Sequence, residues 1–88
     1  MNTIIKVFNL INRSLESNKS AELVFDEINK SKDNNIIVDF ANVVAISRSF
    51  VQSYSAQKKK SNKNISEINI TKDYENMFKM IEKQILMA

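Results

Sequence analysis

The chain has 88 residues and a formal net charge of +3, with 43% hydrophobic and 26% charged residues, an ordinary composition for one globular domain. It contains no Cys, His or Gly. Disulfides, thiolate or imidazole metal ligands, Ser-His-Asp and Cys-His arrangements and Gly-dependent phosphate loops are therefore excluded. We expect a single domain over residues 1–88 that is not an enzyme and binds neither metal nor cofactor.

Turns in this chain must be built without Gly or Pro, so Asn, Asp, Ser and Lys have to form them. Polar clusters at 12–18, 32–35 and 61–64 divide the chain into four blocks. No apolar run approaches the roughly 18 residues that span a bilayer, and no signal-peptide pattern opens the chain. We therefore expect a cytoplasmic protein without a membrane segment.

The first block, residues 3–11, allows two interpretations. Its β-branched and aromatic residues occupy both faces, as in a strand covered by helices, although several also fall at helical spacing. We predict a strand here. A helix is expected to begin near Ser17 or Asn18, because apolar residues then recur on one face. These are Ala21, Val24, Phe25 and Ile28.

The third block contains the clearest strand, at 35–40, where a β-branched run between turn residues predicts a central parallel strand buried on both faces. Ser47 is the expected N-cap of the next helix, since its hydroxyl can accept a bond from a first-turn amide. Ile46 and Val51 are spaced to form a hydrophobic staple around that cap. The helix should end at the three lysines 58–60.

The last block predicts a short strand at 65–70, with Ile68 and Ile70 on one side, and then a helix that begins after Thr71. The apolar stripe of this helix consists of Tyr74, Met77, Phe78, Ile81 and Ile85. Strands and helices thus alternate as βαβαβα, which predicts a small α/β fold whose short, mainly parallel sheet is packed by helices.

The segment 36–50 carries the most informative pattern, a buried strand followed by a polar helix start. Its key residues are Val38-Asp39-Phe40, Val43, Ile46-Ser47 and Ser49-Phe50. This pattern resembles the STAS-like family, small α/β domains related to sulfate-transporter and anti-sigma-factor-antagonist modules, over the middle third of the chain. The resemblance implies a regulatory protein–protein interaction module, with a histidine-kinase-like ATP-binding protein as its partner in a partner-switching system.

In the related anti-sigma-factor antagonists, this junction carries Asp-Ser-Ser-Gly, and the partner phosphorylates one of the serines. Aligned on this chain, Ser47 stands at the Asp, Arg48 at the first Ser, Ser49 at the phosphorylated Ser and Phe50 at the Gly. The acidic residue and the Gly are therefore both replaced here. The resemblance implies a partner-binding or regulatory role for these four residues and Asp39. From the residues alone, Ser47 is an N-cap and Ser49 a first-turn polar residue.

Asp39 lies at the carboxyl end of the predicted central strand, where α/β folds place ligands. A catalytic carboxylate needs a second acid, base or metal ligand, and none is close in sequence. We expect Asp39 to accept hydrogen bonds from the following loop, either from backbone amides or from Ser47 or Ser49.

Two other surfaces bear on partners. The lysines Lys58, Lys59, Lys60 and Lys63 form a basic cluster, and the alternative function is a small nucleic-acid-associated or mobile-element regulator that contacts phosphates through them. Against this, no aromatic residues are interleaved with the lysines. Met80 and Met87 lie outside the apolar stripe of the last helix, where they can fill the core or support a homodimer.

Overall fold

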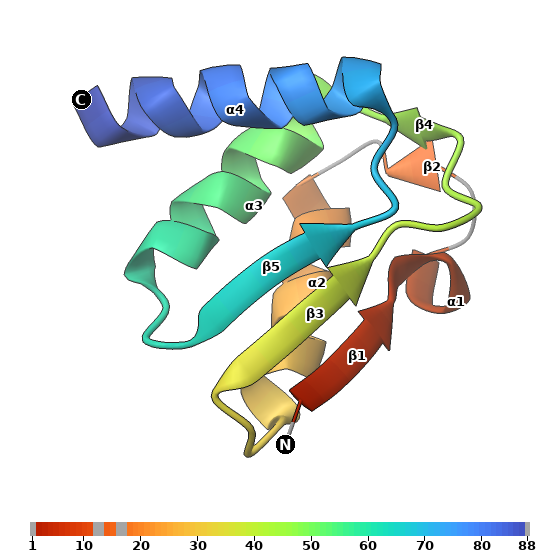
Figure 1. The fold of residues 1–88 in the computed structure, drawn as a ribbon, viewed down its shortest axis with the longest axis vertical. Coiled ribbons are helices and arrows are strands. Elements are labelled where there is room, and N and C mark those ends of the chain that lie inside the picture. The colour runs from red at the N-terminus through yellow and green to blue at the C-terminus, as the bar shows by residue number, and fades with distance from the viewer. Residues whose placement is uncertain (1, 12–13, 16–17, 88) are drawn as a thin grey trace.

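The computed structural model describes residues 2–11, 14–15 and 18–87 (Figure 1). The order of strands and helices follows the predicted βαβαβα pattern, with one additional short helix and two additional two-residue strands. The elements are β1 (Asn2–Lys6), α1 (Val7–Ile11), β2 (Ser14–Leu15), α2 (Asn18–Lys30), β3 (Asn35–Asp39), β4 (Ala45–Ile46), α3 (Arg48–Lys60), β5 (Asn64–Ile68) and α4 (Lys72–Met87).

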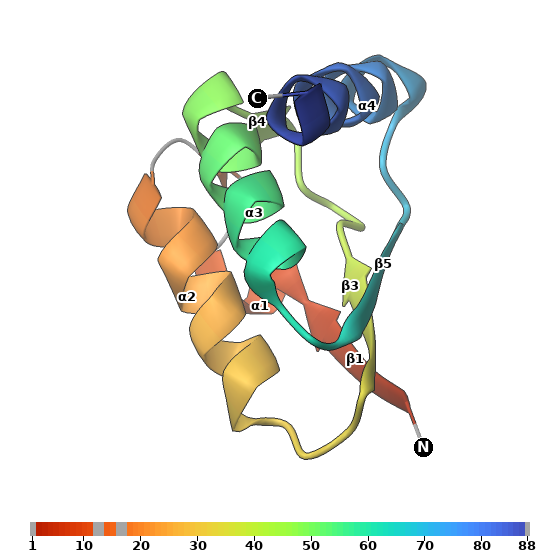
Figure 2. The ribbon, with the colours of Figure 1, turned by 90° about the vertical axis from the view of Figure 1, so that its left-hand side faces the viewer.

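Three strands form the main sheet in the order β1-β3-β5, and both pairings are parallel. A second, two-residue parallel pairing joins β2 to β4. Helices α2 and α3 lie on one face of the main sheet, and α4 crosses over the end at which its strands finish (Figures 1 and 2). The predicted α/β class with a short parallel sheet is thereby confirmed. In the described part of the chain, no helix combines the length and apolarity needed to cross a membrane.

The one-sided arrangement of the helices follows from the strand order. Each crossover connection leads to the next strand on the same side, from β1 to β3 and from β3 to β5. Because both crossovers have the same handedness, their helices α2 and α3 lie on the same face of the sheet. The expectation that both faces of β1 and β3 are buried is therefore wrong. Ile4 in β1 is 58% exposed, and Ile37 in β3 is only half-buried, whereas Ile36 and Val38 are buried beneath the helices.

The core lies between the sheet and its helices. Ile5, Ile36, Val38 and Ile65 supply the strand side, and the predicted stripe of α2 (Ala21, Val24, Phe25, Ile28) is buried against them. An aromatic cluster joins α3 and α4 to this core. Tyr54 stacks on Phe50 with ring centroids 5.7 Å apart, and Phe40 and Phe78 meet Tyr54 edge-on. Such pairs contribute beyond the apolar area that they bury.

Besides β2 and β4, which form in segments predicted to be turns or loops, two segments differ from the sequence prediction. The strand expected over 3–11 ends at Lys6, and α1 begins at Val7, which is fully buried. Lys6 pairs with Asp39, the last residue of β3, so a longer β1 would have lost its hydrogen-bonding neighbour. In β5, Ile65 is the buried isoleucine, while Ile68 is 41% exposed and Ile70 follows the strand. The prediction that Ile68 and Ile70 share one side of a strand is wrong.

The turns confirm that Asn takes the place of Gly. Asn42 and Asn69 have φ angles of 70° and 61°, in the left-handed region. Both follow a strand of the main sheet, after β3 and after β5 respectively. At the start of α4, the Glu75 amide donates to the Thr71 carbonyl over 2.8 Å, which places Thr71 at the expected N-cap position.

Candidate functional site

Helix α3 carries a candidate site at each of its ends. At the N-terminal end, Ser47 has extended backbone angles, and its Oγ accepts a hydrogen bond from the Phe50 amide over 3.1 Å. The Val51 amide donates to the Ser47 carbonyl over 3.2 Å. The predicted N-cap is confirmed, and both residues of the expected staple, Ile46 and Val51, are buried. The Ser47 hydroxyl thus already serves the helix.

The next three residues differ sharply in exposure. Arg48 and Ser49 are exposed in the first turn, whereas Phe50 is fully buried among the aromatic rings of the core. Of the residues singled out at this junction, Arg48 and Ser49 therefore present their side chains at the surface, and Phe50 supplies packing. This difference follows from helical geometry, because the face that carries Phe50, Val51 and Tyr54 points into the core.

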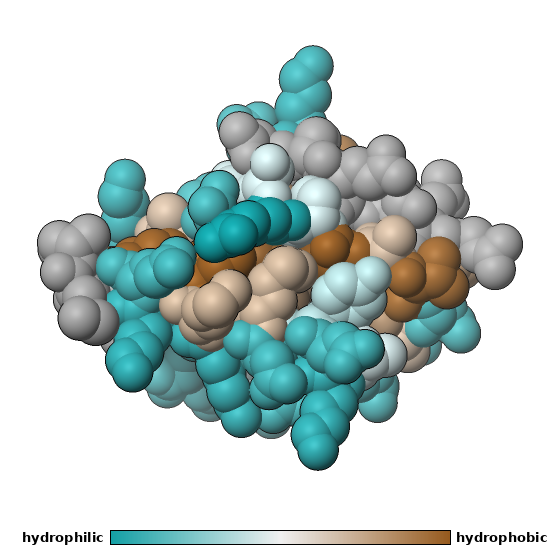
Figure 3. All heavy atoms as spheres, turned by 90° about the horizontal axis from the view of Figure 1, so that it is seen from above, coloured by the Kyte–Doolittle hydropathy of each residue, from teal (hydrophilic) through white to brown (hydrophobic). Residues whose placement is uncertain are grey.

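One exposed apolar residue precedes this end of α3, and another lies on α4. Val44, just before β4, is 60% exposed, and the Tyr74 hydroxyl at the start of α4 donates to the Val44 carbonyl over 3.4 Å. Met80 on α4 is 49% exposed. Seen from above α4, apolar side chains form a band between hydrophilic ones (Figure 3). The N-terminal end of α3 and the residues just before it thus carry a charged group, a hydroxyl and the apolar side chain of Val44.

Asp39 binds both the loop after β3 and the loop after β5, at the edge of the sheet where the strands end. Its Oδ1 accepts bonds from the Ala41 amide over 2.9 Å and from the Asn69 side-chain amide over 2.8 Å. These two donors, Asn69 first, lower the pKa of Asp39 below its usual value. The expected backbone bond from the loop is confirmed. The expectation of a Ser47 or Ser49 donor is wrong, because the second donor comes from the connection after β5.

This edge of the sheet is not a ligand crevice of the usual α/β kind. Such crevices form where the strand order reverses and neighbouring crossovers diverge to opposite faces. The order β1-β3-β5 has no reversal. A cavity of about 170 Å³ lies beside Asp39, lined by Lys6, Phe8, Asn9, Asp39, Ala41 and Asn42. Asp39 Oδ1 is already bonded within the chain, where it links the loops after β3 and β5.

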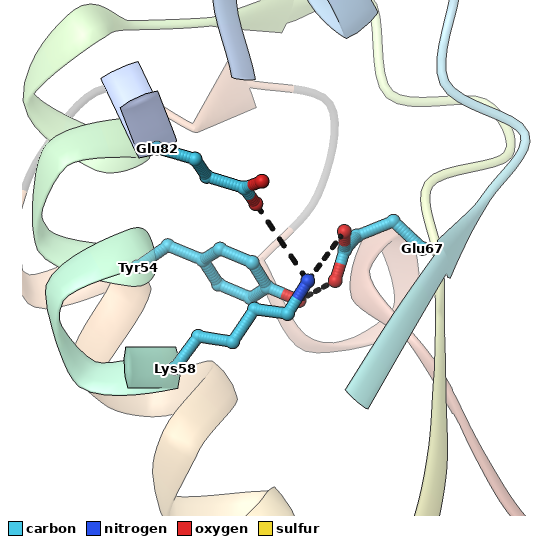
Figure 4. Close-up of polar contacts among 4 residues, drawn as sticks. All are labelled: Tyr54, Lys58, Glu67 and Glu82. Atoms are coloured by element: carbon cyan, nitrogen blue, oxygen red, sulfur yellow. Dashed lines mark hydrogen bonds and ion pairs between the residues drawn. The ribbon is translucent and has the colours of Figure 1, made fainter. Parts of the chain in front are cut away.

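At the C-terminal end of α3, Lys58 is enclosed by acidic residues (Figure 4). Its Nζ lies 3.1 Å from Glu67 on β5 and 3.6 Å from Glu82 on α4. Glu67 also accepts a hydrogen bond from the buried Tyr54 hydroxyl over 2.8 Å. Burial, followed by the charge of Glu67, raises the pKa of Tyr54 well above 10. This cluster joins α3, β5 and α4.

Two further lysines donate hydrogen bonds to carbonyl groups at the C-terminal ends of α4 and α2. Lys59 Nζ donates to the Ile85 carbonyl near the end of α4 over 3.1 Å. Lys63 Nζ donates to the carbonyls of Ile28 and Ser31 at the end of α2. Cations are favourable at these carbonyls, which lack partners within the helix. Among the described residues, Lys60 has neither an ion pair nor a hydrogen bond through its side chain.

A cavity of about 220 Å³ lies between α3 and α4, beside the lysines. Ser55, Lys58, Lys59, Glu82 and Ile85 line it. The Ser55 hydroxyl is buried, and it has no hydrogen-bond partner in the part of the chain that the structure describes. Sequence periodicity gave no signal for this hydroxyl or for the bond between Tyr54 and Glu67, since both depend on the packing of neighbouring elements.

The described residues contain no group of three or more Asp and Glu side chains able to hold a metal ion. The molecule is a small α/β domain with a three-stranded parallel sheet and helices α2 and α3 on one face. No protein-family model, curated protein or solved structure matches the chain.

Proposed function

We propose that this chain is a non-enzymatic, cytoplasmic protein-interaction module of the STAS-like type. The observation that carries the proposal is the contrast at the N-terminal end of α3. There Arg48 and Ser49 are exposed, close in sequence to the exposed Val44, while the Ser47 cap and the buried Phe50 hold the start of the helix in place. We name this surface, formed by Val44, Ser47, Arg48 and Ser49, the α3 junction.

Its mixed chemistry suits a protein partner. Protein interfaces combine an apolar centre with polar groups at the rim, and Arg is enriched in them. Val44 offers apolar area, and Arg48 offers a planar guanidinium that can bind a carboxylate through two hydrogen bonds. The partner we propose is a histidine-kinase-like ATP-binding protein, as the resemblance of segment 36–50 implies.

Phosphorylation of Ser49 is the proposed regulation. The Ser49 side chain is exposed in the first turn of a 13-residue helix. A phosphate there adds about 1.5 to 2 negative charges, which the helix N-terminus and the adjacent Arg48 stabilise. It would also place a hydrated dianion inside any interface formed over the junction. Ser47 is a poorer target, because its hydroxyl oxygen is committed to the helix cap.

The test is affinity capture from the native host lysate at moderate salt with nuclease present. Wild type is compared with Ser49→Asp and with the matched control Asn62→Asp, which adds the same charge at an exposed site beyond the other end of α3. An ATP-binding protein captured by wild type and Asn62→Asp, and lost with Ser49→Asp, supports the proposal. Equal capture by all three moves the interface away from Ser49, and recovery of nuclease-sensitive material alone contradicts the proposal.

The alternative, nucleic-acid binding through Lys58, Lys59, Lys60 and Lys63, is less well supported by the geometry. Lys58 is paired with two carboxylates, and the ammonium groups of Lys59 and Lys63 bind helix carbonyls. Phosphate contact would have to compete with these bonds. A gel shift that weakens steeply with salt, and that is lost in Lys60→Gln, would favour this alternative over protein binding.

A further inference from the structure

The main sheet has a second face, opposite α2 and α3, which we call the open face. In the described part of the chain no helix lies over it (Figures 1 and 2). All-parallel sheets occur almost only with both faces covered, because their strands carry apolar residues on both sides. Here Ile4 is 58% and Ile68 is 41% exposed on this face, and Ile37 is half-buried between them.

The register arranges the open face in three rows across the strands. Successive side chains of a strand alternate between faces, so register partners lie side by side on the same face. From the start of the strands to their ends, the rows are Asn2-Asn35-Asn64, then Ile4-Ile37-Ser66, then Lys6-Asp39-Ile68. A row of two isoleucines and a serine thus lies between a row of amides and a row that holds one charge of each sign and an isoleucine.

We infer that the open face is a homodimer interface in which two copies stack sheet on sheet. The two-fold axis lies midway between the two sheets and is parallel to them. It runs perpendicular to the strands, along the middle row. Each strand then crosses its own copy in the opposite direction, at the usual separation of about 10 Å between packed sheets. Ile4 faces Ile4 and Ile37 faces Ile37 of the second copy.

The charged and amide side chains of the outer two rows favour this axis over one parallel to the strands. The rotation places Lys6 opposite Asn2 of the second copy and Asp39 opposite Asn35. A side-chain amide both donates and accepts, so it can bind either charge. A two-fold axis parallel to the strands would instead stack Asp39 on Asp39, which like-charge repulsion disfavours. The rotation about the perpendicular axis also places Ser66 on Ser66 and Ile68 opposite Asn64. Of these two orientations, only the perpendicular axis keeps like charges apart, so it is the orientation we assign to the isologous interface.

The small size of the open face determines the affinity that we expect between the two copies. It offers nine side chains, three from each strand, whereas a standard interface uses about 20–30 residues a side. The dimer should therefore be weak and dependent on concentration. This inference goes beyond the proposed function, because the α3 junction is a separate set of residues at the N-terminal end of α3.

Sedimentation velocity from micromolar to millimolar protein tests the interface. Wild type should shift from monomer toward dimer as concentration rises. Ile4→Lys puts two ammonium groups face to face at the axis and should leave only monomer. The matched control Leu23→Lys changes an apolar residue that is 50% exposed on α2, and it should dimerise like wild type. A wild type that stays monomeric throughout, or a dimer lost only with Leu23→Lys, overturns the proposal.

A crosslinking experiment tests the axis itself. The chain contains no Cys, so each variant carries a single thiol. A short bismaleimide should join two copies of Ile4→Cys efficiently, because that residue faces itself across the axis, and should join Leu23→Cys poorly. Equal crosslinking of both variants contradicts this geometry. Unfolding temperatures of all variants verify that they fold, and Ser49→Asp should dimerise like wild type, which separates this inference from the proposed function.

Discussion

The two ends of α3 treat their polar side chains in opposite ways. At the C-terminal end, Lys58 pairs with Glu67 and Glu82, and Lys59 reaches the Ile85 carbonyl. At the N-terminal end, the Ser47 hydroxyl caps the helix, while the side chains of Arg48 and Ser49 are exposed. The C-terminal end of α3 thus carries more charged side chains, and more of them are bonded to other parts of the chain.

This difference shows that charge alone does not identify a binding surface. Lysines near helix ends find carbonyls and carboxylates of adjacent elements, and each such bond reduces what they can offer to a partner. In the first turn of a helix, the side chain of the cap residue instead satisfies one of the unpaired backbone amides, and the side chains after it need not take part. The side chains that follow the cap then remain available for another molecule.

The largest expected effect concerns Phe50, which separates core from surface at the α3 junction. Truncation of a fully buried phenylalanine removes its apolar contacts and leaves a cavity. Phe50→Ala should therefore lower the free energy of unfolding by about 3–5 kcal/mol in urea denaturation. The neighbouring exposed Ser49→Ala should change it by no more than about 0.5 kcal/mol. Similar effects of the two variants would contradict the assignment of Phe50 to the core and Ser49 to the surface.

A smaller loss is expected when Lys58 is removed. Lys58→Met keeps the length of the side chain but leaves Glu67, whose side chain is only 13% exposed, and Glu82 without their shared cation. Because these groups are partly solvated, we expect a loss of about 1–3 kcal/mol by urea denaturation, below that of a fully buried pair. Lys60→Met, which breaks no described contact, is the control. Equal stability of the two variants would show that the C-terminal lysines are a solvated face.

Tyr54 should make stability depend on alkaline pH. Its pKa is raised in the folded state, so the folded protein holds the phenolic proton where the unfolded chain releases it. Its contribution is complete below a pH of about 10 and falls above it, by up to about 1.4 kcal/mol per pH unit, until the folded protein also ionises. Urea denaturation at increasing pH should show a shallower decline for Tyr54→Phe. Parallel declines in wild type and Tyr54→Phe would refute the assignment.

The smallest effect tests the cap of α3. Ser47→Ala removes the acceptor for the Phe50 amide and should cost about 1 kcal/mol, whereas Ser47→Asp restores an acceptor and should recover most of that stability. Thermal unfolding measures both variants. If Ser47→Ala also weakens partner capture and Ser47→Asp rescues it, the residue positions the α3 junction. Weak capture by both variants, each folded at the assay temperature, would indicate direct contact by the hydroxyl.

Much of the secondary structure was predictable because its signals are local. The stripe from Ala21 to Ile28 forms α2, the β-branched run around Ile37 forms β3, and Ser47 caps α3. Residues 3–11 were ambiguous, since the same apolar spacing suits a strand or a helix. The structure uses both, because β1 can extend only as far as β3 runs beside it.

The candidate site was predictable only in part. The Ser47 cap joins residues three apart, so their spacing shows it. The Asn69 bond to Asp39 spans 30 residues, and that of Lys63 to the Ile28 carbonyl spans 35. No local pattern encodes such pairs, because they form only when packed elements bring distant loops together.

The sequence by itself determined the alternation of the three main-sheet strands with helices, the parallel sheet and the apolar stripes, because strands and helices place apolar residues at regular spacings along the chain. Only the tertiary structure decided which lysines are occupied, which donors hold Asp39, and that one face of the sheet is left open. These features depend on how crossovers are placed around a shared core. The three-dimensional order of the strands therefore sets which surfaces this small domain can offer to a partner.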